Sequence, residues 1–271
     1  MTTYHRKPNR PKLPPVPAPP APVVQTAAQV ATMSPADALK RFDSVLCVNL
    51  DRRTDRWDEA QRELSLCGLS RCQRVAAVER PNATVGCALT HRGIWRRIAA
   101  GELGERVLVL EDDFKFLTRA ELLRVGSSPE VLRIFDSCPG FGLAERLAPM
   151  LPHVPDGWDL LYLGGSYETR PSGRVHPHVI RNAGMLTTHS YAITKSFAQR
   201  LTAHCDSWCP AGEHIGPADC ALAEQAKRPD VFSYTLSPRL FIQRPSSPSD
   251  INPQPLGFPW SMTDPAHEMM V

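Results

Sequence analysis

Short apolar runs alternate with segments of helical spacing along this chain. Continuous apolar runs rich in β-branched residues predict strands over residues 44–50, 74–78, 106–116, 158–165, 185–194, 231–236 and 239–244. Apolar residues three or four positions apart predict helices over residues 55–67, 86–100, 196–204 and 218–227. Thr54 is expected to cap the first of these helices and Gly68 to end it. Strands that alternate with helices predict an α/β domain with a mostly parallel central sheet flanked by helices.

The composition indicates one globular domain with a proline-rich arm. The chain has 271 residues, of which 42% are hydrophobic, and a formal net charge of +3. Residues 1–35 contain four basic residues, no acidic residue and nine of the 27 prolines, so we expect a disordered basic arm there. Without the arm, basic and acidic residues balance to within one charge. We therefore expect the folded domain at residues 36–251 and a second proline-rich tail at residues 252–271.

Nothing in the sequence is typical of an export signal or of a membrane span. No run reaches the roughly 18 apolar residues that cross a bilayer, and prolines interrupt the apolar residues near the start. The eight cysteines are then expected to be reduced thiols, because the cytosolic glutathione pool opposes disulfides. We therefore expect a cytoplasmic protein.

Two polar clusters follow predicted strands at the points where those strands end. The first contains Asn49, Asp51, Arg52 and Arg53, and the second contains Glu111, Asp112 and Asp113. The carboxyl ends of parallel strands meet at one edge of a sheet, where the ligands of such sheets bind. We therefore expect the two clusters to face one crevice.

The three consecutive carboxylates indicate a site for a divalent cation. Like charges at the end of a buried strand repel one another unless a cation neutralises them, and oxygen ligands suit Mn²⁺ or Mg²⁺. Glu111 and Asp113 are expected to point the same way and share the metal, while Asp112 turns aside. A solvated acidic turn or a helix cap is the alternative interpretation.

The arginines near the first predicted strand complement these carboxylates. Guanidinium groups bind phosphate oxygens through paired hydrogen bonds, so Arg52, Arg53 and Arg56 are candidate phosphate ligands. Alone, they are also typical of a solvated helix start, and Arg56 can pair with acids in the first turn.

These residues carry a resemblance to a known family. Five segments follow one another in the order VLCVNLDRRTDRW, VGCALTHRGIW, RVLVLEDDFKF, THSYAIT and LFIQRPSSPSDI, over residues 44–251. This order resembles glycosyltransferase family 25, which contains lipooligosaccharide and collagen galactosyltransferases. The second segment has Thr90 where the family has serine before His91, and the third corresponds to the family's version of the metal-binding Asp-x-Asp motif.

The resemblance implies a GT-A fold and a metal-dependent glycosyltransferase. The donor would be a UDP-sugar, and the metal would be Mn²⁺ or Mg²⁺. The enzyme would transfer a hexose, galactose or glucose, with inversion to a hydroxyl of a glycan such as lipooligosaccharide. The metal ligands would be Glu111, Asp113 and Asp250. The donor-binding residues would be Asn49, Leu50, Arg53, Arg56, His91, Glu111 and Asp112.

An inverting transfer also needs a general base on the acceptor hydroxyl. Asp219 is the candidate, because GPADCAL resembles the family's Pro-Val-Asp segment, with alanine in place of valine. The alternative is that Asp219 caps its helix, and Glu213 and Asp250 are rival candidates for the base.

Several other side chains have a structural interpretation. His91 and His189 lie in matched segments, but a histidine between apolar neighbours is more often a core residue. The aromatic residues expected in the core are Trp95, Trp158 and Tyr162. A group with enough nitrogen and sulfur for structural zinc consists of His204, Cys205, Cys209, His214 and Cys220, but its irregular spacing favours buried reduced cysteines.

Three other functions stay open. A metal-dependent phosphohydrolase or nuclease would also place carboxylates at strand ends, and a catalytically silent module would bind a nucleotide sugar without turnover. The third is a glycosyltransferase that acts on modified DNA or on a protein. Four charges in the arm are too few to indicate a nucleic-acid partner.

Overall fold

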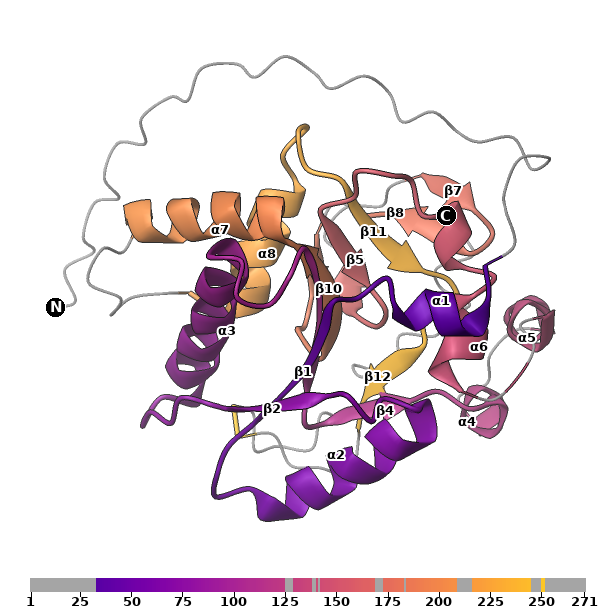
Figure 1. Ribbon diagram of the computed structural model, residues 1–271, viewed down its shortest axis with the longest axis horizontal. Coiled ribbons are helices and arrows are strands. Elements are labelled where there is room, and N and C mark those ends of the chain that lie inside the picture. The colour runs from indigo at the N-terminus through magenta and orange to yellow at the C-terminus, as the bar shows by residue number, and fades with distance from the viewer. Residues whose placement is uncertain are drawn as a thin grey trace, which may run out of the picture.

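An eight-stranded sheet forms the centre of the molecule (Figure 1). The computed structural model describes residues 33–124, 129–137, 140, 142–168, 173–182, 184–208, 216–244 and 250–251. The strands of this sheet are β1 (Ser44–Asn49), β2 (Gln73–Ala76), β3 (Arg106–Glu111), β5 (Leu160–Tyr162), β7 (Arg174–His176), β8 (Val179–Arg181), β10 (Ser190–Thr194) and β11 (Ser233–Leu236). Their order across the sheet is β2-β1-β3-β10-β5-β11-β8-β7.

The sheet is mixed in its strand pairing. β1 lies parallel to β2 and β3, and β5 lies parallel to β11. β10 lies antiparallel between β3 and β5, and β8 lies antiparallel between β11 and β7. Six of these strands therefore run in one direction, and β10 and β8 run in the other. The α/β class is confirmed, and the mostly parallel sheet that we expected is broken by these two strands.

Helices cover both faces of the sheet because each strand presents alternate residues to opposite sides. In β1, Val45 and Cys47 belong to one hydrophobic cluster, while Leu46 and Val48 belong to a second. The first cluster is closed by α1 (Pro35–Leu39), α2 (Thr54–Cys67) and α6 (Leu143–Leu147). The second is closed by α3 (Ala83–Ala99), α7 (Lys195–Trp208) and α8 (Ala218–Ala226), which lie together on one side in Figure 1.

Shorter elements fill the rest of the described chain. The helical pieces between β4 (Phe114–Phe116) and β5 are α4 (Arg119–Arg124), α5 (Pro129–Ser137), α6 and the 3₁₀ turn Leu151–His153. Two small sheets pair β4 with β12 (Phe241–Gln243), and β6 (Ser166–Glu168) with β9 (Met185–Leu186). We did not predict β6, β7 or β8, because these three-residue strands are too short for a periodic pattern and, unlike β4, β5 and β12, lie outside the apolar runs identified above.

Two of the predicted strands are interrupted, and both interruptions matter for the site. The strand expected over 106–116 is divided into β3 and β4 by a turn at Asp112 and Asp113. The strand expected over 185–194 is divided into β9 and β10, with Thr187 between them in the left-handed region at φ 74°. Each break turns polar groups away from the regular alternation of a strand.

The helix boundaries agree with most of the sequence signals. Gly68 ends α2 with a left-handed φ of 71°, as predicted. The N-cap of α2 is Arg53 rather than Thr54, which is the first helical residue, and Arg53 makes no side-chain capping bond. α3 begins at Ala83, earlier than predicted, because the Asn82 side chain accepts a hydrogen bond from the Thr84 amide.

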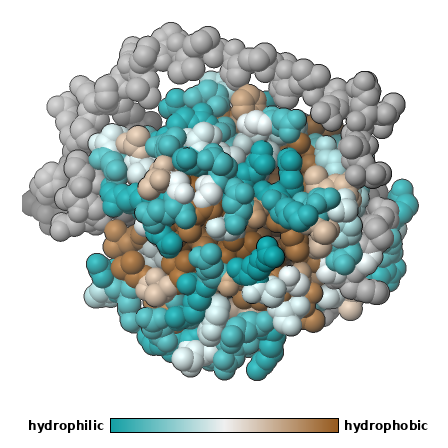
Figure 2. Space-filling model, in the orientation of Figure 1, coloured by the Kyte–Doolittle hydropathy of each residue, from teal (hydrophilic) through white to brown (hydrophobic). Residues whose placement is uncertain are grey.

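The predicted core aromatic residues are buried. Trp95, Trp158 and Tyr162 all lie inside, and so do His91 and His189. Figure 2 shows hydrophobic residues gathered across the middle of the visible face, with hydrophilic residues above and below them. None of the described helices is both long and apolar enough to cross a bilayer.

The expected arm and tail fall mostly on residues that the structure does not describe. Residues 1–32 and 252–271 lie outside the described segments. The expected arm extends to residue 35, but Pro35 is the first residue of α1, and Ser34 caps that helix by accepting a hydrogen bond from the Asp37 amide. The folded part therefore begins at least two residues before the predicted boundary at residue 36.

Candidate functional site

A pocket opens at the carboxyl ends of β1 and β3. The two strand ends are neighbours, because Val48 in β1 pairs with Glu111 in β3. The pocket is lined by Val48, Asn49, Leu50, Arg52, Arg56, Ala77, Val78, Glu79, Arg80, Ala83, Cys87, Glu111, Asp112, Asp113, Gln243, Asp250 and Ile251. The two polar clusters that follow these strands therefore face one crevice, as their positions in the sequence predicted.

Most of the predicted site residues line this pocket. Those that do are Asn49, Leu50, Arg52, Arg56, Glu111, Asp112, Asp113 and Asp250. Arg53 and His91 do not line the pocket themselves, but each binds a residue that does. Arg53 binds Asp250, and His91 binds Glu111. The lining residues to which the sequence assigned no role include Cys87, in the predicted helix 86–100, and Gln243, in the predicted strand 239–244.

Arg56 is the central cation of the site. The first turn of α2 places it against the β3–β4 turn, where its side chain is 8% exposed. Its Nη2 atom lies 2.6 Å from Asp112 Oδ1 and 2.7 Å from Asp113 Oδ2. Burial opposes its charge, but Asp113 and Asp112 raise its pKa above the ordinary value. One guanidinium group thus pairs with two neighbouring carboxylates and offsets the charge of one of them.

This geometry corrects the expected orientation of the three acids. We expected Glu111 and Asp113 to point together and Asp112 to turn aside. Instead, Asp112 and Asp113 share Arg56, and Glu111 contacts a different set of residues. The alternation of a strand does not continue past Glu111, because the next two residues form a turn.

Asp250 binds the arginine cluster. Its carboxylate lies 2.6 Å from Arg52 Nη2, 2.8 Å from Arg53 Nη1 and 3.3 Å from Arg56 Nη1. Partial burial raises the pKa of Asp250, but the arginines outweigh this effect and lower it. The three predicted phosphate ligands therefore converge on one anion, which is a carboxylate of the chain itself. Asp250 is not gathered with Glu111 and Asp113 into a three-carboxylate group.

Asn49 binds the second carboxylate oxygen of Asp112, while Arg56 binds the first. The Asn49 amide is buried, and its Nδ2 donates to Asp112 Oδ2 at 2.7 Å and to the Arg53 carbonyl at 3.0 Å. Its Oδ1 accepts from Arg74 Nη2 at 2.7 Å. Asn49 therefore joins the end of β1 to the start of α2 and to the β3–β4 turn.

Asp113 has one carboxylate oxygen that the described protein does not use. Its Oδ2 accepts from Gln243 Nε2 at 2.9 Å in addition to Arg56. Its Oδ1 is buried and has no hydrogen-bond partner among the described residues. A buried carboxylate oxygen without a partner is costly unless a cation or water binds it, and this atom belongs to a residue that lines the pocket.

Glu111 is bound by side chains from α3 and from the segment before β10. Its Oε1 accepts from Thr188 Oγ1 at 2.6 Å and lies 2.9 Å from His91 Nε2. Burial raises the pKa of Glu111, but the hydrogen bonds and charge of His91, with the Thr188 hydroxyl, lower it to about 2. Glu111 is therefore a carboxylate at neutral pH.

Asp219 lies in the first turn of α8. Its Oδ1 accepts from the Cys220 amide at 2.7 Å and its Oδ2 from the Thr187 amide at 3.2 Å. Thr187 has a left-handed backbone, and the next residue, Thr188, binds Glu111. This strained segment therefore connects Asp219 to Glu111, although Asp219 is not among the described residues that line the pocket.

Two of the alternative assignments cannot be followed through the described chain. Glu213, the rival general base, lies outside the described residues, and so do Cys209 and His214 of the irregular zinc group. Within the described segments, one group of three cysteine, histidine or acidic side chains has ligand atoms that all lie within 4.8 Å of one another. That group is Cys87, His91 and Glu111, which we did not predict from the sequence.

The pKa of Asp112 predicts a specific pH dependence of stability. Burial raises this pKa from 3.8 to about 6, with Asp113 and Glu111 adding to the shift and Arg56 opposing it. Between these values the folded chain holds a proton that the unfolded chain has released. The Asp112 contribution to the free energy of unfolding is therefore present at low pH and falls as pH rises through about 6.

This contribution is measured by urea unfolding at several pH values between 3.8 and about 6, in the wild type and in Asp112→Asn. We expect the free energy of unfolding of the wild type to fall relative to that of the variant as pH rises. Parallel curves for the two proteins would show that Asp112 does not titrate in this window.

Among known proteins, only solved structures resemble this chain, and the resemblance is distant. No protein-family model and no curated protein matches the chain. A glycosyltransferase involved in the glycosylation of the major capsid of PBCV-1 matches with a TM-score of 0.34 and 9% identity over 62% of this chain and 67% of that one. A197 from STIV matches with a TM-score of 0.38 and 9% identity, over 74% of this chain and 84% of that one.

Mannose-1-phosphate geranyltransferase from Thermus thermophilus matches with a TM-score of 0.37 and 12% identity, over 71% of this chain and 72% of that one. TM-scores below 0.5 are too low to assign a family. What can be said of the chain therefore rests on its own structure. It has a mixed β-sheet flanked by helices, and the strand ends of this sheet hold three carboxylates and an arginine cluster.

Proposed function

We propose that the chain is a metal-dependent inverting glycosyltransferase that moves a hexose, galactose or glucose, from a UDP-sugar to a hydroxyl acceptor. The observation that carries this proposal is the single pocket at the ends of β1 and β3, which is lined by the Asn-Leu, arginine and Glu-Asp-Asp residues of two separate motifs. The ordered segments that resemble glycosyltransferase family 25 supply the reaction class. The expected acceptor is a glycan such as lipooligosaccharide.

One buried carboxylate oxygen of the pocket supports the proposed hard divalent cation. The unpartnered Oδ1 of Asp113 is an oxygen donor that Mn²⁺ or Mg²⁺ accepts, and Glu111 is the second proposed ligand. When bound, the cation would stabilise the charge that develops on the leaving diphosphate. Gln243 holds the other oxygen of Asp113, so the side chain is oriented before a cation binds.

The arginine cluster fits the diphosphate of the donor. Arg52, Arg53 and Arg56 already converge on one anion, the Asp250 carboxylate. A diphosphate carries more negative charge than a carboxylate and offers more acceptor oxygens, so we expect it to replace Asp250 at these guanidinium groups. Asp250 can act as the proposed metal ligand only after the diphosphate has displaced its carboxylate from the arginines.

The other pocket residues have supporting parts in this proposal. Asn49 and Leu50 follow β1 directly and are expected to meet the uracil or ribose, with Asn49 oriented by Asp112 and Arg74. His91 holds Glu111, so we expect it to act on the donor through that carboxylate. Each of these residues binds or orients, and none has to change its protonation state.

Asp219 stays the proposed general base on the acceptor hydroxyl. Both of its oxygens accept hydrogen bonds from backbone amides, and these bonds orient the carboxylate. The remaining lone pairs are left to take the proton of the acceptor hydroxyl. We expect Asp219→Asn to lower the transfer rate by about 10²-fold and to leave the affinity for UDP unchanged. Transfer kinetics and calorimetry separate the two effects.

The matched control for this variant is Glu224→Gln, an exposed acidic residue on the same helix. It is expected to transfer at the wild-type rate. An Asp219→Asn variant that transfers as fast as this control would remove Asp219 from the chemistry and leave it as a residue that stabilises the start of α8.

The proposed function is tested by hydrolysis of a panel of UDP- and GDP-sugars with Mn²⁺, which needs no acceptor. We expect release of sugar from UDP-galactose or UDP-glucose that depends on the metal. The panel includes a simple phosphate ester. Phosphate release from that ester, with every sugar nucleotide intact, would support a phosphohydrolase and overturn the glycosyltransferase.

One observation favours a second candidate, a nucleotide-sugar-binding module without turnover. Arg56 already pairs with both Asp112 and Asp113, so part of the negative charge of the pocket is offset without a cation. The two candidates differ in the same experiment. Tight UDP binding with no hydrolysis or transfer of any donor would select the silent module.

A further inference from the structure

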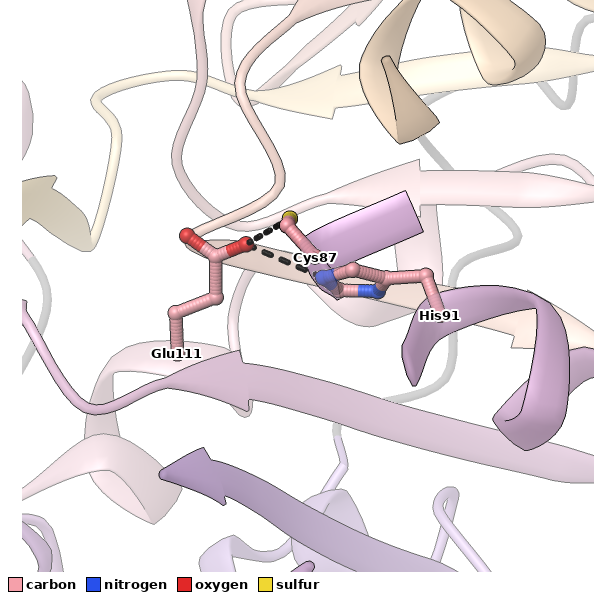
Figure 3. Close-up of side chains that lie close together, drawn as sticks. All are labelled: Cys87, His91 and Glu111. Atoms are coloured by element: carbon pink, nitrogen blue, oxygen red, sulfur yellow. Dashed lines mark hydrogen bonds and ion pairs between the residues drawn. The ribbon is translucent and has the colours of Figure 1, made fainter. Parts of the chain in front are cut away.

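Three side chains of different chemistry converge beside the pocket: a thiol, an imidazole and a carboxylate. Figure 3 shows Cys87 and His91 on a helix, both directed at Glu111. Glu111 Oε1 lies 2.9 Å from His91 Nε2 and 3.9 Å from Cys87 Sγ. All three ligand atoms lie within 4.8 Å of one another, and no other such group of three occurs within the described segments.

The local structure explains why these side chains meet. Cys87 and His91 are four residues apart in α3, so they lie one above the other on the same face of the helix. Glu111 is the last residue of β3, where the strand reaches that face. His91 is fully buried, and its Nδ1 lies 2.8 Å from the Tyr191 hydroxyl, which also accepts from Trp95 Nε1 at 2.9 Å.

We propose that Cys87, His91 and Glu111 form a binding site for a soft divalent cation, with Zn²⁺ as the preferred metal. Thiolate and imidazole ligands favour Zn²⁺ over Mn²⁺ and Mg²⁺, which prefer oxygen. Zinc bond lengths of about 2.0–2.3 Å place tetrahedral ligand atoms about 3.3–3.7 Å apart. The present spacings of 2.9 and 3.9 Å lie on either side of this range, so small side-chain shifts suffice.

The charges of the group also fit a divalent cation. Burial raises the pKa of the Cys87 thiol well above its ordinary value, and the charge of Glu111 adds to this effect. A coordinating thiol nevertheless loses its proton to the metal. One thiolate, one carboxylate and a neutral imidazole then balance the two charges of the zinc ion, which matters because His91 is buried and Cys87 and Glu111 are partly buried.

The surroundings of His91 suit a metal ligand. Coordination through Nε2 requires the proton of the neutral ring to lie on Nδ1. The Tyr191 hydroxyl oxygen has two lone pairs. One accepts the hydrogen bond from Trp95 Nε1, so the other can accept a hydrogen bond from His91 Nδ1–H. A hydrogen bond from the other ring nitrogen is the usual means by which proteins orient a histidine ligand.

Three protein ligands leave one position of a tetrahedral zinc ion open. Cys87 and Glu111 both line the pocket at the strand ends, so the open position belongs to the pocket side. The site shares Glu111 with the proposed Mn²⁺ site but uses two ligands that Mn²⁺ does not favour. It is a separate claim from the glycosyltransferase, because it depends on no donor and no turnover.

The test is the metal content of the full chain, purified without chelators and equilibrated with Zn²⁺ alone. We expect about one zinc per chain in the wild type, and a large loss in Cys87→Ser. Cys220→Ser is the matched control, because Cys220 is an exposed cysteine of the irregular group discussed above. It is expected to retain the zinc of the wild type.

A second measurement gives its positive result in the wild type alone, so that result does not depend on how a variant folds. Co²⁺ in place of Zn²⁺ is expected to give the sulfur-to-cobalt charge-transfer absorption of a thiolate ligand, and this band is expected to disappear in Cys87→Ser. Substoichiometric zinc in the wild type, zinc retained in Cys87→Ser, or zinc lost in Cys220→Ser would each overturn the proposal. No sugar nucleotide is present, so this failure is distinct from a failure of the proposed function.

Discussion

Asp113→Ala is expected to lower Mn²⁺-dependent hydrolysis of the UDP-sugar by about 10²–10⁴-fold. The variant removes the one buried carboxylate oxygen of the pocket that has no partner among the described residues, which is the atom proposed to hold the cation. Loss of one metal ligand costs several kcal/mol of transition-state stabilisation, and about 1.4 kcal/mol corresponds to each factor of ten in rate. Initial rates at saturating Mn²⁺ measure the effect.

Two variants separate this effect from a change in fold. Asp113→Asn keeps the size of the side chain and an acceptor for Gln243, yet removes the charge, so we expect it to be nearly as impaired as alanine. Asp58→Ala changes an exposed acid on α2 and is expected to hydrolyse the donor at the wild-type rate. If Asp113→Ala is as active as Asp58→Ala, Asp113 holds no catalytic metal.

Arg56→Ala is expected to lower the free energy of unfolding by about 3–5 kcal/mol at neutral pH. The buried guanidinium group lies within 2.7 Å of both Asp112 and Asp113, and its removal leaves two buried carboxylates without their cation. Breaking a buried ion pair from one side has this cost, because the remaining charge stays desolvated. Urea unfolding of the wild type and the variant measures it.

The control and the pH dependence of this variant follow from the same contacts. Arg62→Ala removes an exposed arginine of the same helix and is expected to change the free energy of unfolding by less than about 0.5 kcal/mol. The loss in Arg56→Ala is expected to shrink below about pH 6, where Asp112 takes up a proton. A loss equal to that of Arg62→Ala would show that Arg56 is not a buried counter-charge.

The position of the pocket could be predicted from sequence because strand ends are local signals. An apolar run that stops at polar residues identifies Asn49 and Glu111 as strand ends, and parallel pairing brings such ends to one edge. The left-handed Gly68 that ends α2 was equally visible, because glycine adopts this backbone without strain. These features need no knowledge of distant contacts.

The orientation of the acids could not be predicted in the same way. Whether the strand continues past Glu111 depends on β4 pairing with β12, whose residues lie more than a hundred positions along the chain. The pairing of Asp250 with Arg52, Arg53 and Arg56 depends on a still longer separation, which no local pattern reports. The interruption at Thr187 is hidden because a threonine seldom adopts a left-handed backbone.

The group of Cys87, His91 and Glu111 shows what a spacing rule could have found. Cysteine and histidine four residues apart in a predicted helix share one face, so this part of the site was visible in the sequence. The third member comes from the neighbouring strand. Cys87 also fits the apolar spacing of the helix and the segment that resembles the family, and neither pattern indicates a metal ligand.

The most direct test of the central claim is calorimetric titration of the wild type with UDP, in the presence and absence of Mn²⁺. The proposed function predicts binding that is strong with Mn²⁺ and much weaker without it, and a loss of this difference in Asp113→Ala. No binding of UDP under either condition, or an affinity that is the same with and without Mn²⁺ in both proteins, would contradict a nucleotide-sugar site built on these carboxylates.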